Sequence, residues 1–287
     1  MKQVEELIHR LKTRLGDELG LLEFLVVAGS WVRWSKGLES LKPNDVDLLL
    51  IGKDPTCLVT PKLEIARICR EVEGVYVFSD FVSQPALEMI AQRACPDPVG
   101  IHLMYYPDFD DARCNLPPTL LLSMGREMEV RLGDRARLEG IVLELEAKVS
   151  RMPFSERVRL PAFLEQWYSL FVLGNRHIET DRLGREMIFE CLKKFARYIT
   201  KVTLSEILRE HGRRPASSSW RDLTSELGRV RSQLRIAAIG EYIVGLQVLF
   251  EPHPFAGPAD LDKAKDLFIR SLRLYESAMK YYGGLEA

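Results

Sequence analysis

In this chain of 287 residues, segments with the pattern of β-strands are confined to the first half. They are short, apolar and bounded by Gly, Pro, Asn or Asp, which is typical of strands that end in turns. The predicted strands are LEFLVVAG (22–29), DVDLLLIG (45–52), GVYVFSDF (74–81), VGIHLMYYP (99–107) and, as an edge strand, REMEVRLG (126–133). Beyond about residue 135 no convincing strand pattern remains. The contrast predicts an α+β protein with a sheet-containing domain over residues 1–135 and an all-helical domain over residues 136–287.

Helical segments are predicted where apolar residues recur three and four positions apart. In the first half they are 2–18, 61–73, 84–94 and 117–124, with a turn or short helix directly after Gly29. In the second half they are 135–149, 156–178, 185–200, 220–250 and 260–282. Breaks that contain Gly, Pro or Ser at 211–219 and 251–260 separate the last three of these helices.

Composition and charge narrow the class of protein. Apolar residues make up 46% of the chain, so a sizeable core can form. The net charge of −1 includes no strong basic excess, and an extended nucleic-acid surface is therefore not expected. The charge is uneven, however: residues 1–150 carry 24 acidic and 18 basic side chains, whereas residues 151–287 carry 17 acidic and 22 basic ones. This asymmetry suits an anionic ligand near the second half.

Cysteine usage and hydropathy bear on the compartment. The five cysteines are dispersed without a C-x-x-C pair, which favours reduced thiols over disulfides or a zinc site. No window approaches the roughly 18 uninterrupted apolar residues of a membrane helix. The first 20 residues are amphipathic and lack the apolar core of a signal peptide. We therefore expect a soluble, cytoplasmic protein with no membrane partner.

Two polar motifs stand at the ends of the first two predicted strands: Gly29 and Ser30 end one, and Asp45 and Asp47 open the next. Because alternate side chains of a strand share a face, the two aspartates point the same way. Their repulsion is relieved if a divalent cation lies between them and a phosphate. Gly29 allows close approach of the backbone, and the Ser30 hydroxyl and helix N-terminal N–H groups can donate to phosphate oxygens. The same residues also fit a plain strand-to-helix turn and an aspartate that caps the Pro-Asn turn.

The order of these motifs, VVAGS (26–30), a loop and DVDLLLI (45–51), resembles the nucleotidyltransferase superfamily of DNA polymerase β. The resemblance covers roughly the first half of the chain. The helical second half, and MEVRLGD (128–134) before it, resemble the small nucleotidyltransferases that modify antibiotics and their relatives. For the fold, the resemblance implies a mixed sheet flanked by helices, followed by a bundle-like helical domain.

For function, the resemblance implies a Mg²⁺-dependent, or Mn²⁺-dependent, nucleotidyltransferase. Such an enzyme binds a nucleoside triphosphate such as ATP and transfers the nucleoside monophosphate to a hydroxyl group of a small molecule, a protein or RNA. The acceptor, the preferred base and the oligomeric state, for which a homodimer is one option, stay open. The residues that the resemblance assigns are Asp45 and Asp47 as catalytic metal ligands, and Gly29, Ser30 and Arg33 as nucleotide-binding residues.

The sequence departs from this family in ways that bear on catalysis. Active members usually have an Arg-Gly pair a few residues after the serine, whereas here Arg33 is followed by Trp34. The family's third carboxylate, on a later strand, has no counterpart at the expected place. The candidates near that place are Tyr76, Asp80 and His102. The alternative hypothesis is therefore a binding or regulatory protein that keeps the nucleotidyltransferase fold and has lost catalysis.

The residues just after Ser30 leave two further alternatives. Arg33 and Lys36 can reach a triphosphate, or they can be solvated surface charges. Trp31 and Trp34 can stack on a base, although tryptophans in such a position more often pack the turn.

Overall fold

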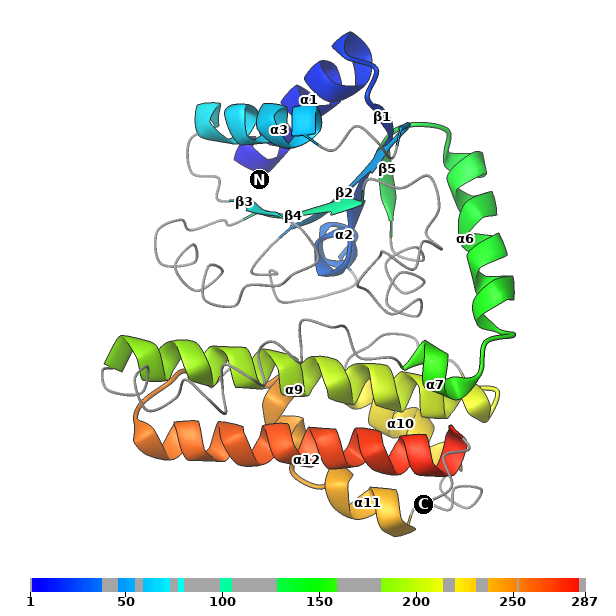
Figure 1. The fold of residues 1–287 in the computed structure, drawn as a ribbon, viewed down its shortest axis with the longest axis vertical. Coiled ribbons are helices and arrows are strands. Elements are labelled where there is room, and N and C mark those ends of the chain that lie inside the picture. The colour runs from blue at the N-terminus through cyan, green and yellow to red at the C-terminus, as the bar shows by residue number, and fades with distance from the viewer. Residues whose placement is uncertain are drawn as a thin grey trace. The chain divides into compact units, whose positions relative to one another are not determined.

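The computed structural model describes residues 2–37, 46–54, 59–72, 77–79, 99–104, 128–158, 182–213, 220–230, 237–251 and 253–283. It is a mixed α+β protein and mostly helical, which confirms the predicted class at this level (Figure 1). The chain divides into two compact units, Met1–Ser150 and Arg151–Ala287. The sequence placed the division after residue 135; the helix at 135–149 instead belongs to the first unit.

The first unit contains a mixed sheet of five strands in the order β3-β4-β2-β1-β5. The strands are β1 (Leu22–Ala28), β2 (Asp47–Gly52), β3 (Val77–Ser79), β4 (Val99–Met104) and β5 (Glu129–Leu132). β1 pairs antiparallel with β2 on one side and with β5 on the other. β4 pairs parallel with both β2 and β3. All five strands lie within the predicted segments, and β5 is an edge strand as predicted.

The helices of the first unit are α1 (Lys2–Leu11), the π-helix η1 (Lys12–Glu18), α2 (Ser30–Ser35), α3 (Val59–Glu71) and α6 (Arg135–Val149). The sequence predicted one regular helix over 2–18, and the structure changes it to π geometry at Lys12. A side chain at Gly16 would overlap the Leu132 side chain, so the glycine allows η1 to pack closely on β5. The predicted helices at 84–94 and 117–124 lie outside the described residues.

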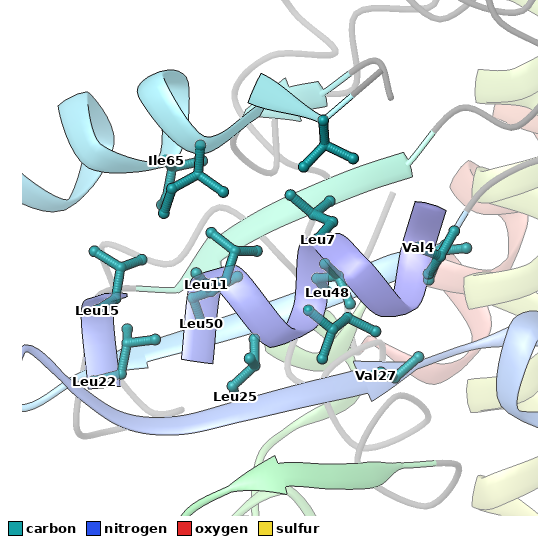
Figure 2. Packing of buried hydrophobic residues seen from close by; sticks show 14 of the residues in the cluster. Val4, Leu7, Leu11, Leu15, Leu22, Leu25, Val27, Leu48, Leu50 and Ile65 are labelled. Atoms are coloured by element: carbon teal, nitrogen blue, oxygen red, sulfur yellow. The ribbon is translucent and has the colours of Figure 1, made fainter. Parts of the chain in front are cut away.

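The core of this unit forms between α1, α3 and the sheet. Figure 2 shows Val4, Leu7 and Leu11 of α1 directed toward β1 and β2. Leu25 and Leu48 meet them from the strands, and both are 0% exposed. The apolar residues of α1 follow the spacing that the sequence predicted. Their burial holds the two central strands in place, and with them the strand ends that carry the predicted site.

The second unit is built on two long helices. Its elements are α7 (Phe154–Arg157), α9 (Arg182–Glu210), α10 (Trp220–Val230), α11 (Ala237–Ile243), the 3₁₀ helix η2 (Leu246–Phe250) and α12 (Pro258–Tyr282). α9 and α12 pack side by side and run in the same direction (Figure 1). α9 continues ten residues beyond its predicted end at 200. The prediction of one helix over 220–250 is wrong, because Gly245 adopts a left-handed conformation (φ 88°) that separates α11 from η2.

A buried charged cluster joins α7 to the end of α9. Arg157 and Glu206 are only 5% and 1% exposed. Arg157 Nε donates to Glu206 Oε2 at 2.6 Å, and a second nitrogen of the guanidinium group donates to Glu210. Arg157 also donates to the carbonyl oxygen of Met152. Buried charges are tolerated when each has a hydrogen-bonded partner of opposite charge, as here.

Within the ranges given above, no helix combines the length and the apolar character that crossing a membrane requires.

Candidate functional site

The predicted site residues Gly29, Ser30 and Asp47 meet where β1 ends and β2 begins. Because the two strands are antiparallel, the last residue of β1, Ala28, is paired with the first residue of β2, Asp47. Gly29 and Ser30 follow Ala28 directly. The pairing brings together residues that are 17 and 18 positions apart in the sequence.

Gly29 is the residue on which this meeting depends. Its backbone has φ 74° and ψ −152°, a region that is essentially restricted to glycine. A Cβ atom at this position would overlap the Asp47 carboxylate oxygen Oδ2. The Asp47 carboxylate therefore lies directly against the Gly29 backbone. The sequence predicted a glycine for close approach to a ligand, and the described contact partner of this glycine is the aspartate.

The helix α2 continues from the site. Ser30, Arg33 and Trp34 occupy one face of this helix, at positions i, i+3 and i+4, and all three are half-buried. Trp31 and Val32 are buried and belong to the hydrophobic core. The packing interpretation therefore holds for Trp31. Trp34 packs against the same core but retains partial exposure.

The remaining predicted candidates are distributed differently. Asp45, Tyr76 and Asp80 lie outside the described residues. His102 occupies the position of β4 that is paired with Leu49, and Leu49 is two residues beyond Asp47 along β2. Lys36 is exposed at the end of α2.

Asp47 and Ser30 are oxygen donors of the kind that Mg²⁺ accepts. Mg²⁺ usually takes one or two carboxylates and completes its coordination with phosphate oxygens and water. One described carboxylate, held against a glycine backbone, fits this requirement. The part of the chain that the structure describes contains no group of three or more His, Cys, Asp or Glu side chains that could hold a metal by themselves. Asp47 and Arg33 each already interact with another group of the chain, so a ligand must exchange those interactions.

A second polar cluster, which the sequence did not predict, lies in the second unit. Lys193 Nζ donates to the carbonyl oxygen of His253 at 3.0 Å, and His253 Nε2 lies 3.1 Å from Asp260 Oδ1. Burial lowers the pKa of Lys193 because it disfavours the charged amine. Backbone N–H donation from Ala256 is the main cause that lowers the pKa of Asp260. These residues also line a small cavity between α9 and α12. Because Lys193 and His253 are 60 residues apart, no local sequence signal could have joined them.

Comparison of the chain with models of protein families, with curated proteins and with solved structures yields no match.

Proposed function

We propose that this protein is a Mg²⁺-dependent nucleotidyltransferase that transfers a nucleoside monophosphate from a nucleoside triphosphate to a hydroxyl acceptor. The main support for the proposal is the contact between Gly29 and Asp47, which lie where the paired ends of β1 and β2 meet. Backbone conformations like that of Gly29 cluster at active sites and ligand clamps, and this one lies against a carboxylate. The order of the two residues along the chain matches the family resemblance, with Gly-Ser after one strand and aspartate opening the next.

In this proposal the chain's own residues hold and orient the triphosphate. Ser30 donates its hydroxyl to a phosphate oxygen, and Arg33, one turn along α2, adds a positive charge. Asp47, together with Asp45, would hold the metal ion. When bound, Mg²⁺ neutralises negative charge on the phosphates. Positioning and charge neutralisation supply most of the rate enhancement in such transfers.

The reaction itself is a substitution at the α-phosphorus. The oxygen of the acceptor hydroxyl forms a bond to this phosphorus, and the bond from the phosphorus to the oxygen bridging to the β-phosphate breaks. Pyrophosphate leaves with the electron pair, and the proton of the hydroxyl passes to solvent. We also propose the fold that corresponds to this activity, which is a nucleotidyltransferase-like mixed sheet followed by an all-helical domain.

A thermal-shift panel tests the proposal. ATP, GTP, CTP and UTP are each added with and without Mg²⁺ to the wild type and to Asp45→Asn/Asp47→Asn. A ligand that binds only the folded state raises Tm. We expect a Mg²⁺-dependent rise that the double variant loses. Asp54→Asn, the same substitution just beyond the other end of β2, serves as the matched control and should keep the rise.

Release of pyrophosphate then separates catalysis from binding. An enzyme releases pyrophosphate from the preferred nucleotide once its acceptor is present. Mg²⁺-dependent binding without release, across small-molecule, protein and RNA acceptors, would favour the alternative of a catalytically degenerate binding protein. No shift in Tm with any nucleotide at millimolar concentration would contradict the proposed enzyme.

A further inference from the structure

Trp34 of α2 packs against the core of the first unit and is still partly exposed. Trp34 is one helical turn beyond Ser30 and lies on the same half-buried face of the helix. Side chains of helical residues lean toward the N-terminus of the helix, so we expect the Trp34 indole to lean toward the turn that contains Ser30. That turn adjoins Gly29 and Asp47. Trp34 would then offer a flat aromatic surface beside the residues proposed to hold the phosphates.

A neighbouring ring fixes the orientation of this surface. The ring centroids of Trp31 and Trp34 are 5.1 Å apart with an angle of 51° between their planes. Trp31 is only 6% exposed and is anchored in the core. The buried indole therefore supports the partly exposed one from one side. Such preorganisation reduces the entropy lost when a ligand stacks on the ring.

Aromatic side chains recognise nucleobases through the faces of both ring systems, and stacking tolerates different bases because every base has a π-face. Arg33, the residue before Trp34 in α2, adds a positive charge to the same short helix. We propose that Trp34 is the surface on which the base of the bound nucleotide stacks. This inference rests on the proposed function, because it assigns the base of a nucleotide whose phosphates lie at Ser30 and Asp47. It implies binding with little preference among the four bases.

The experiment compares a ligand that has a base with one that has none. Dissociation constants for Mg²⁺-ATP and Mg²⁺-tripolyphosphate are measured by isothermal titration calorimetry on the wild type, Trp34→Leu and Trp34→Phe. The matched control is Trp220→Leu, because Trp220 is also half-buried and also contacts one aromatic ring, that of Phe250, at 5.1 Å. Thermal unfolding checks that every variant is folded.

We expect Trp34→Leu to weaken ATP binding by about 5- to 150-fold, the range expected for the loss of one base–aromatic stack, and to leave tripolyphosphate binding unchanged. Trp34→Phe should retain most of the ATP affinity, and Trp220→Leu all of it. The inference is overturned if Trp34→Leu binds ATP like the wild type, or if it loses both ligands in parallel. If the wild type binds neither ligand, the proposed function fails first and the inference fails with it.

Discussion

The two units differ in how far their polar residues are buried and paired. In the first unit, Gly29, Ser30 and Asp47 are half-buried at the ends of strands whose other residues are almost entirely buried. In the second unit, Arg157 and Glu206 lie fully inside and bond to each other. The first arrangement keeps the polar groups partly exposed, whereas the second buries them and pairs them with each other.

Under the proposed function, this difference separates residues that would bind the ligand from residues that stabilise the fold. A buried ion pair stabilises little compared with an apolar pair of the same shape, but removing one partner leaves a charge without compensation. Half-buried polar groups at a strand end cost little to maintain, because water can replace a missing partner. Variants of the second unit should therefore change stability most, and variants of the first unit should change ligand binding more than stability.

The largest effect is expected for Arg157→Met, which leaves Glu206 buried without its main partner. Loss of one member of a buried ion pair typically costs about 3–5 kcal/mol. Arg209 Nε remains 3.5 Å from Glu206 Oε1, so we expect the lower end of this range. The free energy of unfolding from urea titration measures the effect.

The double variant Arg157→Met/Glu206→Leu is the control, since it removes both charges. It should recover most of the lost stability, because Glu210 is 34% exposed and can be hydrated. If the double variant is as unstable as Arg157→Met, the uncompensated Glu206 carboxylate does not cause the loss of stability. The loss would then come from the missing interactions of Arg157 itself.

A smaller loss is expected for Gly29→Ala in the first unit. The backbone conformation of Gly29 costs about 1–3 kcal/mol for a residue with a Cβ atom, and this Cβ would also displace the Asp47 carboxylate. We therefore expect lower stability together with loss of the nucleotide-dependent rise in Tm. Gly37→Ala is the matched control: Gly37 has φ 71°, but a Cβ there meets no atom of the described residues within 4 Å. It should lose about 1 kcal/mol from backbone strain and keep ligand binding. Equal loss of binding in both variants would contradict a specific role for the Gly29–Asp47 contact.

Much of the fold followed from local pattern, but the meeting of the site residues did not. The strands at 22–28 and 47–52 are apolar runs bounded by Gly and Asp, and such runs are visible in any sequence. Their antiparallel pairing, which puts Asp47 opposite Ala28, depends on long-range contacts that no short window contains. The π-helix at Lys12–Glu18 and the break at Gly245 were missed for a related reason. Both follow from packing or a single backbone conformation, whereas the apolar periodicity continues through them.

A gain in stability is expected in the second unit for Thr200→Val. Thr200 and Thr203 are 0% exposed, and their hydroxyl groups have no hydrogen-bond partner among the residues that the structure describes. An unsatisfied buried polar group costs about 1–3 kcal/mol, and valine has nearly the same shape without the hydroxyl, so we expect a gain of about 1 kcal/mol in the free energy of unfolding. Thr224→Val is the control, because Thr224 Oγ1 donates to the Trp220 carbonyl oxygen at 2.8 Å and its loss should bring no gain. Destabilisation by Thr200→Val would instead indicate an internal water bound to that hydroxyl.

The smallest effect is expected for the half-buried ion pair of Arg14 and Glu64, which joins η1 to α3 in the first unit. Arg14 Nε donates to Glu64 Oε2 at 2.9 Å, and this hydrogen bond is the main cause that lowers the pKa of Glu64. Because the pKa in the folded state lies below that in the unfolded state, the stabilisation is present at neutral pH and is lost as the pH falls through the acidic range in which Glu64 becomes protonated. The difference in Tm between the wild type and Arg14→Gln should therefore shrink toward pH 3. It should also shrink in 1 M NaCl, where the screening length falls to about 3 Å.

The control is Arg135→Gln, which removes an ion pair with Glu139. The two side chains of this pair are 78% and 56% exposed, so the variant should leave Tm unchanged under all these conditions. A difference for Arg14→Gln that persists at pH 3 and in high salt would mean that the arginine stabilises the unit by packing its aliphatic stem and not by its charge.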